Sequence, residues 1–162
     1  MELNAIATRA VALLRDRGLT VATAESCTGG LIAAAITDVA GASRVFGTGV
    51  VSYSCDCKIK LLGVSAATLE AEGAVSATTA AGMAEGVRRV ADAAIGVSVT
   101  GEAGPIAAEK HPVGTVFIGL SDEGGTITEE HHFEGDRAAI RRQAATAVLS
   151  LLVRRLEGVE VC

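Results

Sequence analysis

The sequence predicts an α/β fold: a single three-layer α/β/α domain with a mixed sheet and helices on both faces. Short β-branched runs such as Val21–Ala24 alternate with helical patterns early in the chain, which favours parallel strands joined by helices. Two strand-like runs later flank the turn Asp122–Gly125, a pattern typical of an antiparallel hairpin. Parallel strands followed by a hairpin give a mixed sheet.

Local signals place the elements in chain order. Apolar residues recur at helical spacing from Leu3 to Leu14, and Gly18 is placed to end that helix. A helix from Leu31 to about Asp38 follows the strand Val21–Ala24. The remaining expected elements are a strand over Val45–Ser54, a loop or short helix over Cys55–Leu62, a brief helix capped by Ser65, a longer helix capped by Ser76, strands over Ala94–Val99, Thr115–Leu120 and Thr126–Phe133, and a long helix capped by Asp136.

Composition limits the class of protein and its partners. The 162 residues suffice for one domain with its own core, and we expect residues 1–162 to form that domain. A net charge of −5 and only 2% aromatic residues do not suit a nucleic-acid partner. No apolar run reaches the ~18 residues that a membrane span needs, so we expect no membrane association.

Cysteine usage and the first residues indicate the compartment. The four cysteines do not resemble a disulfide scaffold, and the N-terminus lacks the basic-then-apolar order of a signal peptide. We therefore expect a cytoplasmic protein with reduced thiols. Small apolar-rich α/β domains with alanine-rich helices often self-associate, and a homo-oligomer is expected.

The stretch Glu25–Gly30 is the best candidate for chemistry in this sequence. It lies between an expected strand and an expected helix, at the edge of the sheet where α/β proteins place their ligands. Ser26 suits a nucleophile or an anion-binding hydroxyl, but a serine before a helix is also an ordinary N-cap. Each glycine in a first helical turn lowers helix stability by about 1 kcal/mol relative to Ala. This cost is easier to explain if a ligand must approach the backbone closely.

A nucleophilic serine needs a base, and the residues alone leave that base open. None of the three histidines lies near a strand end that obviously faces Ser26. Lys58 follows a strand end shortly after Tyr53. A lysine acts as a base only if desolvation or nearby cations bring its pKa from ~10.4 to roughly 7–8. Without further information, Lys58 is better explained as a solvated charge.

Two other groups of residues have both a ligand-binding and an ordinary interpretation. The run Cys55–Cys57 has a Cys-x-Cys spacing that is tighter than usual for zinc, and no second pair exists, so we expect no metal. Arg137, Arg141 and Arg142 suit a phosphate clamp at the start of the last helix, or a solvated helix face.

Taken together, these motifs resemble the CinA C-terminal domain family. The match rests on Ala24–Gly30, Tyr53-Ser54 with Lys58 and Leu61–Val64, Glu72–Ser76, Val99–Gly101 with Ala103–Pro105, Pro112–Val116, and Gly135–Arg137 with Arg141–Ala144. The motifs follow the family's order over nearly the whole chain. The resemblance implies a nicotinamide mononucleotide deamidase, an amidohydrolase that converts the carboxamide of this pyridine nucleotide to the acid plus ammonia without a metal or other cofactor.

The resemblance also implies catalytic roles for individual residues. Ser26 matches the family's nucleophile, Lys58 matches the lysine that activates it, and Tyr53 matches a tyrosine that assists proton transfer. Chemically, Ser26 would attack the amide carbon while Lys58 accepts its proton. Backbone N–H groups from Cys27 to Gly30 would hold the oxyanion.

The expected substrate contacts are of two kinds. The resemblance assigns a substrate-contacting turn and the basic positions near the phosphate, and these match Thr100, Gly101, Arg137, Arg142 and, as a further candidate, Arg141. The residues of the first turn add Thr28, Gly29 and Gly30 through their backbone. On charge alone, the Glu25 carboxylate is expected to attract the cationic pyridinium ring, an inference from the residue and not from the family.

Two departures from the family's pattern leave alternative functions open. Cys55 replaces the Asn of Tyr-Ser-Asn-x-x-Lys, and the loop after Gly101 has Glu102 in place of Ile, lacks the glycine-rich part and is shorter. The alternatives are a nucleotide-binding or regulatory module without efficient turnover, an amidase for another pyridine or nucleotide amide, and a thiol- or metal-dependent hydrolase that uses Cys27 or the Cys55/Cys57 pair.

Overall fold

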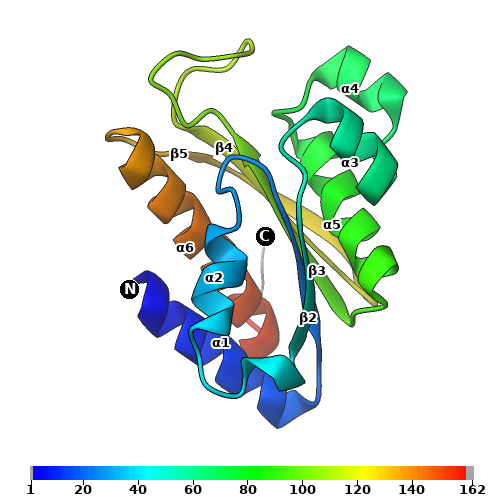
Figure 1. Cartoon of the computed structure of the whole chain (residues 1–162), viewed down its shortest axis with the longest axis vertical. Helices are drawn as coiled ribbons and strands as arrows, with labels where there is room; N and C mark the ends of the chain where they lie inside the picture. Colours follow the sequence, from blue (N-terminus) through cyan, green and yellow to red (C-terminus); the bar gives the residue numbers. More distant parts are fainter. Residues whose placement is uncertain (1, 160–162) are drawn as a thin grey trace.

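Five strands form one mixed sheet in the computed structural model, which describes residues 2–159 (Figure 1). The strands are β1 (Val21–Glu25), β2 (Phe46–Val51), β3 (Ile95–Gly101), β4 (Thr115–Asp122) and β5 (Gly125–His132). They lie in the order β2-β1-β3-β4-β5. Strand β1 pairs in parallel with β2 and β3, whereas β3 with β4 and β4 with β5 are antiparallel. The expected mixed sheet is confirmed.

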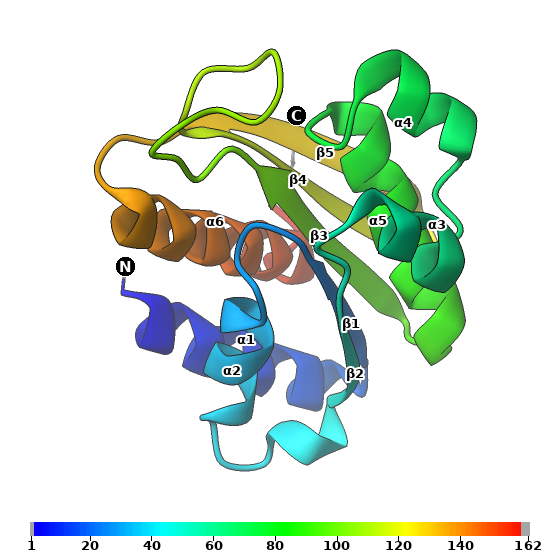
Figure 2. The same cartoon turned by 45° about the horizontal axis from the view of Figure 1, so that its top comes forward.

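Helices cover both faces of the sheet, as Figure 2 shows. One layer contains α1 (Leu3–Arg17), α2 (Leu31–Thr37) and α6 (Arg137–Glu157). The other contains α5 (Ala77–Ala91), with α3 (Cys55–Leu62) and α4 (Ala66–Glu72) packed beside it. A short 3-10 helix, η1 (Ala42–Arg44), precedes β2. Within residues 2–159, no helix combines the length and the apolar character needed to cross a bilayer.

The core has one part on each face of the sheet. Leu14 of α1 and Leu151 of α6 are fully buried in the larger part. On the other face, Met83 of α5 packs in a cluster with Ala22 and Ala24 of β1. Strand β1 is therefore buried along its whole length, as expected for a parallel strand with helices on both sides.

Most element boundaries follow the capping signals in the sequence. Gly18 ends α1 in the left-handed conformation with φ of 65°, which glycine adopts without steric cost. The side chains of Ser65, Ser76 and Asp136 each accept a backbone N–H bond at the start of α4, α5 and α6. These caps satisfy donors that the first turn of a helix leaves unpaired.

The connection between β2 and α3 differs from the sequence pattern. The β-branched composition extends to Ser54, but β2 ends at Val51. The reason is that Ser54 caps α3, and its hydroxyl accepts the N–H of Cys57 at 3.2 Å. The segment Cys55–Leu62 is accordingly a helix and not a loop.

The topology brings several chain segments to the carboxyl end of β1. The helix α2 connects β1 to β2 over one face, while α3, α4 and α5 connect β2 back to β3 over the other. Because β1 lies between β2 and β3, these two connections diverge above its carboxyl end. Open α/β sheets bind ligands in the crevice at such a point. Ser26 is the first residue after β1.

Candidate active site

Ser26 and Lys58 meet at the carboxyl end of the sheet although 32 positions separate them in the chain. The Lys58 Nζ donates a hydrogen bond to the Ser26 Oγ at 2.9 Å and another to the Ser52 carbonyl at 2.7 Å. A third, longer contact of 3.4 Å joins the Lys58 Nζ to the Tyr53 carbonyl. The amine is thus surrounded by three oxygen atoms, one of them the candidate nucleophile.

The order of β2 and α3 explains why the Lys58 side chain reaches Ser26. Side chains on a helix lean toward its N-terminus, and the N-terminus of α3 closely follows the end of β2. Ser26 is fixed separately, because its N–H donates to the Val99 carbonyl of β3 at 3.0 Å. Because β1 and β2 are neighbouring parallel strands, the Ser26 hydroxyl after β1 and the Lys58 amine after β2 lie at the same edge of the sheet.

Burial changes the acid–base properties of Lys58. Only 1% of the residue is exposed, and burial lowers the pKa of its ammonium from the ordinary 10.5, because the charged form loses hydration. A lower pKa increases the fraction of neutral amine near neutral pH. A neutral amine beside a hydroxyl is what general-base activation of a serine requires.

The carboxylate of Glu25 holds the turn after β1 through hydrogen bonds to neighbouring residues. It is 1% exposed and accepts the Thr28 hydroxyl at 2.7 Å and the backbone N–H groups of Ile32 and Ala33 at 2.8 and 3.0 Å. These groups belong to the turn and to the start of α2, where a negative charge is favourable. This placement does not support the expected contact of Glu25 with a substrate cation. The side chain that accepts N–H groups at the start of α2 is Glu25, and not Ser26 as an N-cap.

Arg141 braces the same turn from α6. Its Nε donates to the Cys27 carbonyl at 3.0 Å, and an Nη donates to the Thr28 carbonyl at 2.8 Å. Gly29 and Gly30 complete the turn with φ of 61° and 103°, a region that favours glycine. Of the described residues, these two glycines, Thr28 and Arg141 shape the turn but do not line the cavity described next.

A cavity of about 380 Å³ opens above the Ser26–Lys58 pair. Its walls come from the ends of β1, β2 and β3, from α3, from the segment 74–75, from the loop 102–109 and from the start of α6. The volume lies in the lower part of the range for small-molecule sites. Both Thr100 and Gly101 line it, and the Thr100 hydroxyl donates to the Ala74 carbonyl at 2.7 Å.

Arg137 and Tyr53 form one wall of this cavity. One Nη of Arg137 donates to the Gly104 carbonyl at 2.6 Å, and the other donates to the Tyr53 hydroxyl at 3.0 Å. Tyr53 is 61% exposed, and within residues 2–159 no hydrogen bond joins its phenol to Ser26 or Lys58. The structure thus brings the backbone of Tyr53, and not its hydroxyl, to the lysine.

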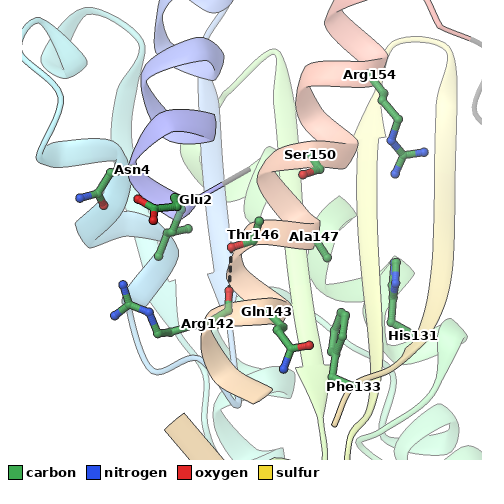
Figure 3. Close-up of a pocket in the computed structure, with 11 residues that line it drawn as sticks. Glu2, Asn4, His131, Phe133, Arg142, Gln143, Thr146, Ala147, Ser150 and Arg154 are labelled. Atoms are coloured by element: carbon green, nitrogen blue, oxygen red, sulfur yellow. Dashed lines mark hydrogen bonds between the residues drawn. The ribbon is translucent and has the colours of Figure 1, made fainter. Parts of the chain in front are cut away.

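Arg142 belongs to a different cavity, of about 630 Å³, between the start of α1, β5 and α6 (Figure 3). This larger cavity also contains His131 and Ser150, but within residues 2–159 no hydrogen bond links them, and the His131 Nε2 contacts Glu129 at 3.0 Å. The three arginines expected at one phosphate are therefore split, with Arg137 at the Ser26 cavity.

Two acidic residues of the loop after β3, Glu102 and Glu109, belong to the site but were not predicted from the sequence. The Glu102 carboxylate is buried and accepts the N–H groups of Ala108 and Glu109, both at 2.9 Å. The Glu109 carboxylate in turn accepts the N–H groups of Ala74 at 2.9 Å and Val75 at 3.3 Å. The loop is thus folded around the Glu102 carboxylate. The departure of Glu102 from the pattern expected by resemblance was the available signal in the sequence.

The cysteines near the site lack the features of a reactive centre. Burial raises the pKa of the Cys27 thiol to about 12, so the thiol stays protonated near neutral pH and is a weak nucleophile. Cys55 and Cys57 lie in the first turn of α3, the former exposed. In the part of the chain that the structure describes, no three or more His, Cys, Asp or Glu side chains gather as a metal site would require.

Fold and site together define an α/β protein with a buried serine–lysine pair above the central parallel strands. The CinA C-terminal domain model matches residues 3–156, and the chain belongs to this family. The resemblance inferred from the motifs is confirmed.

Relatives of known sequence agree with this assignment. The CinA-like protein of Geobacter sulfurreducens is 49% identical over 154 residues, which cover 94% of this chain and 37% of the relative. The CinA-like protein of Frankia casuarinae is 49% identical over 146 residues, or 90% of this chain and 34% of the relative. The chain thus spans little more than a third of the length of these curated relatives.

Solved structures cover almost the same length as this chain. The CinA superfamily protein from Klebsiella pneumoniae superposes with a TM-score of 0.94 at 34% identity, over 98% of this chain and 99% of its own. The competence/damage inducible protein CihA from Agrobacterium tumefaciens gives a TM-score of 0.92 at 38% identity, over 97% and 96%. The α/β fold is therefore that of the CinA superfamily.

The role of Glu25 as a brace can be tested by its effect on stability. We expect Glu25→Gln to lower the free energy of unfolding by about 2 kcal/mol, because the new amide group leaves buried N–H donors unpaired. Urea denaturation of this variant measures the change, with Glu134→Gln on the surface as the control, expected within about 0.5 kcal/mol of the parent. Equal stability of the two variants would contradict the role.

Proposed function

We propose that the chain is a nicotinamide-nucleotide amidohydrolase, which converts the carboxamide of nicotinamide mononucleotide to the acid plus ammonia. The proposal depends above all on the 2.9 Å hydrogen bond between the buried Lys58 Nζ and the Ser26 Oγ at the floor of a cavity. Membership of the CinA C-terminal domain family supports it. The resemblance described above implies a deamidase, and the residues to which it gives catalytic roles, Ser26, Lys58 and Tyr53, are present in this chain.

The surroundings of Lys58 suit the first step. A neutral amine has two N–H bonds and one lone pair. When the N–H bonds are donated to the Ser52 and Tyr53 carbonyls, the lone pair faces the Ser26 hydroxyl. Lys58 then accepts the hydroxyl proton while the Ser26 oxygen attacks the amide carbon, and a tetrahedral intermediate forms.

The turn after Ser26 offers a donor for the developing oxyanion. In the backbone hydrogen bonds of residues 2–159, the N–H of Cys27 has no acceptor, and this residue directly follows the nucleophile. Because Arg141 holds the Cys27 and Thr28 carbonyls, the turn is oriented before the reaction begins. Donors fixed in advance stabilise charge that appears in the transition state.

The remaining steps return the enzyme to its starting state. The Lys58 ammonium gives its proton to the departing nitrogen, so ammonia leaves and an ester of Ser26 remains. Lys58, neutral again, accepts a proton from a water molecule that attacks this ester, and the acid is released as Ser26 recovers its proton. No metal enters the scheme. Tyr53 takes part as a wall of the cavity through its bond to Arg137.

Loss of the nucleophile tests the reaction directly. We expect Ser26→Ala to reduce ammonia release from nicotinamide mononucleotide by at least about 10³-fold, whereas Cys27→Ala stays within about tenfold of the parent. Because no metal takes part in the proposed reaction, a chelator should leave the activity unchanged. Binding of the nucleotide without any ammonia release by the parent would instead favour a nucleotide-binding module.

Phosphate recognition by Arg137 gives a second test. We expect Arg137→Gln to raise KM for nicotinamide mononucleotide by about tenfold or more with a small change in kcat, because a charged hydrogen bond to the phosphate is lost. The control is Arg142→Gln, whose side chain lines the other cavity. Steady-state kinetics with the riboside, which lacks the phosphate, should show no effect of either variant. An equal KM change in the two variants would contradict the assignment.

A further inference from the structure

The proposed substrate carries a positive charge on its pyridine ring, and the cavity needs a group that responds to this charge. The Glu25 carboxylate is committed to α2 and does not line the cavity. Of the described residues that line it, two are acidic, Glu102 and Glu109, and both belong to the loop after β3. A carboxylate that recognises the ring must therefore come from this loop.

The two carboxylates differ in what they contact. Glu102 is 4% exposed, and both of its oxygens accept N–H groups of its own loop, at Ala108 and Glu109. Its role is to fold the loop. Glu109 is only half-buried, and its carboxylate bridges from the loop to the opposite segment, at Ala74 and Val75. A carboxylate has about four lone-pair sites, so two N–H contacts leave capacity for another partner.

Neighbouring backbone fixes the position of the Glu109 carboxylate. The N–H of Glu109 is held by Glu102 at 2.9 Å, which anchors the residue in the loop. On the other side, a Cβ at position 73 would collide with the Glu109 carboxylate, and Gly73 leaves that space free. The charge is thus fixed in place before a ligand arrives.

The charge of Glu109 also acts at the serine–lysine pair. Burial lowers the pKa of Lys58, and the negative charge of Glu109 acts in the opposite direction. Glu109 and Lys58 both line the cavity, so a charge bound there lies in the field of both groups.

We propose, on the basis of the function proposed above, that Glu109 is a specificity-determining residue that selects the cationic pyridinium ring over uncharged rings. Its carboxylate forms one wall of the cavity in which the Ser26–Lys58 pair lies, and Arg137 forms another wall. The two charges are held by different segments, so the cationic ring and the anionic phosphate of one nucleotide have separate partners of opposite charge.

The test compares binding of two ligands that differ in ring charge. Nicotinamide mononucleotide has a cationic ring, and its 1,4-dihydro form has the same carboxamide, ribose and phosphate on an uncharged ring. Calorimetric Kd values are measured with the full chain carrying Ser26→Ala, which prevents turnover. We expect the cationic form to bind about tenfold more tightly, and Glu109→Gln to reduce this ratio to about twofold or less.

Controls separate charge from structure. Glu72→Gln removes an exposed charge just before the same segment and should keep the tenfold ratio. The amide side chain that Glu109→Gln introduces retains a carbonyl oxygen for the Ala74 N–H, and thermal unfolding checks that this variant is folded. The ratio of the two Kd values is first measured with Glu109 intact, and equal binding of the two ligands there overturns the inference. A preference for the cationic ring that Glu109→Gln leaves unchanged overturns it as well. Binding of neither ligand overturns the proposed function itself.

Discussion

The buried amine of Lys58 is the group on which the rest of the site depends. A charged ammonium loses most of its hydration in this position, and its hydrogen-bond partners are uncharged oxygens of Ser26, Ser52 and Tyr53. Burial lowers the pKa of the ammonium for this reason. In the proposed mechanism, the neutral amine donates its N–H bonds to the two carbonyls, which leaves its lone pair for the hydroxyl. Burial and these contacts are the features on which the proposed role of Lys58 as a base depends.

The scaffold keeps the amine and the hydroxyl in contact by fixing the turn after β1 from three sides. Glu25 binds the start of α2, Arg141 reaches the turn from α6, and the Ser26 N–H bonds to β3. Each of these contacts uses a backbone group that a turn or a helix end leaves unpaired. Glu25 and Arg141, which suggest ligand binding in the sequence, therefore hold the turn that carries Ser26, the proposed nucleophile. Arg137 and Glu109 are among the charged residues that line the cavity itself.

The sequence predicted the elements well because their boundaries are set by local chemistry, as at Gly18 and Ser76. The pairing of Ser26 with Lys58 followed only from the family resemblance, because no local pattern shows which strands are neighbours. The arginines were misjudged as a group: five positions on a helix correspond to about 140° of rotation, so Arg137 and Arg142 face different cavities. The contacts of Glu109 depend on an irregular loop, for which the sequence has no periodicity.

A direct titration of the lysine side chains tests the central claim that the amine beside Ser26 is readily neutral. The chain has three lysines, of which Lys60 and Lys110 are exposed, so NMR of protein labelled at the lysine Cε carbons gives three resolvable curves, assigned with Lys58→Arg. The account predicts that the pKa of Lys58 lies clearly below the ordinary 10.5, because burial disfavours its charged form. A Lys58 curve with its midpoint at or above 10.5 would contradict it.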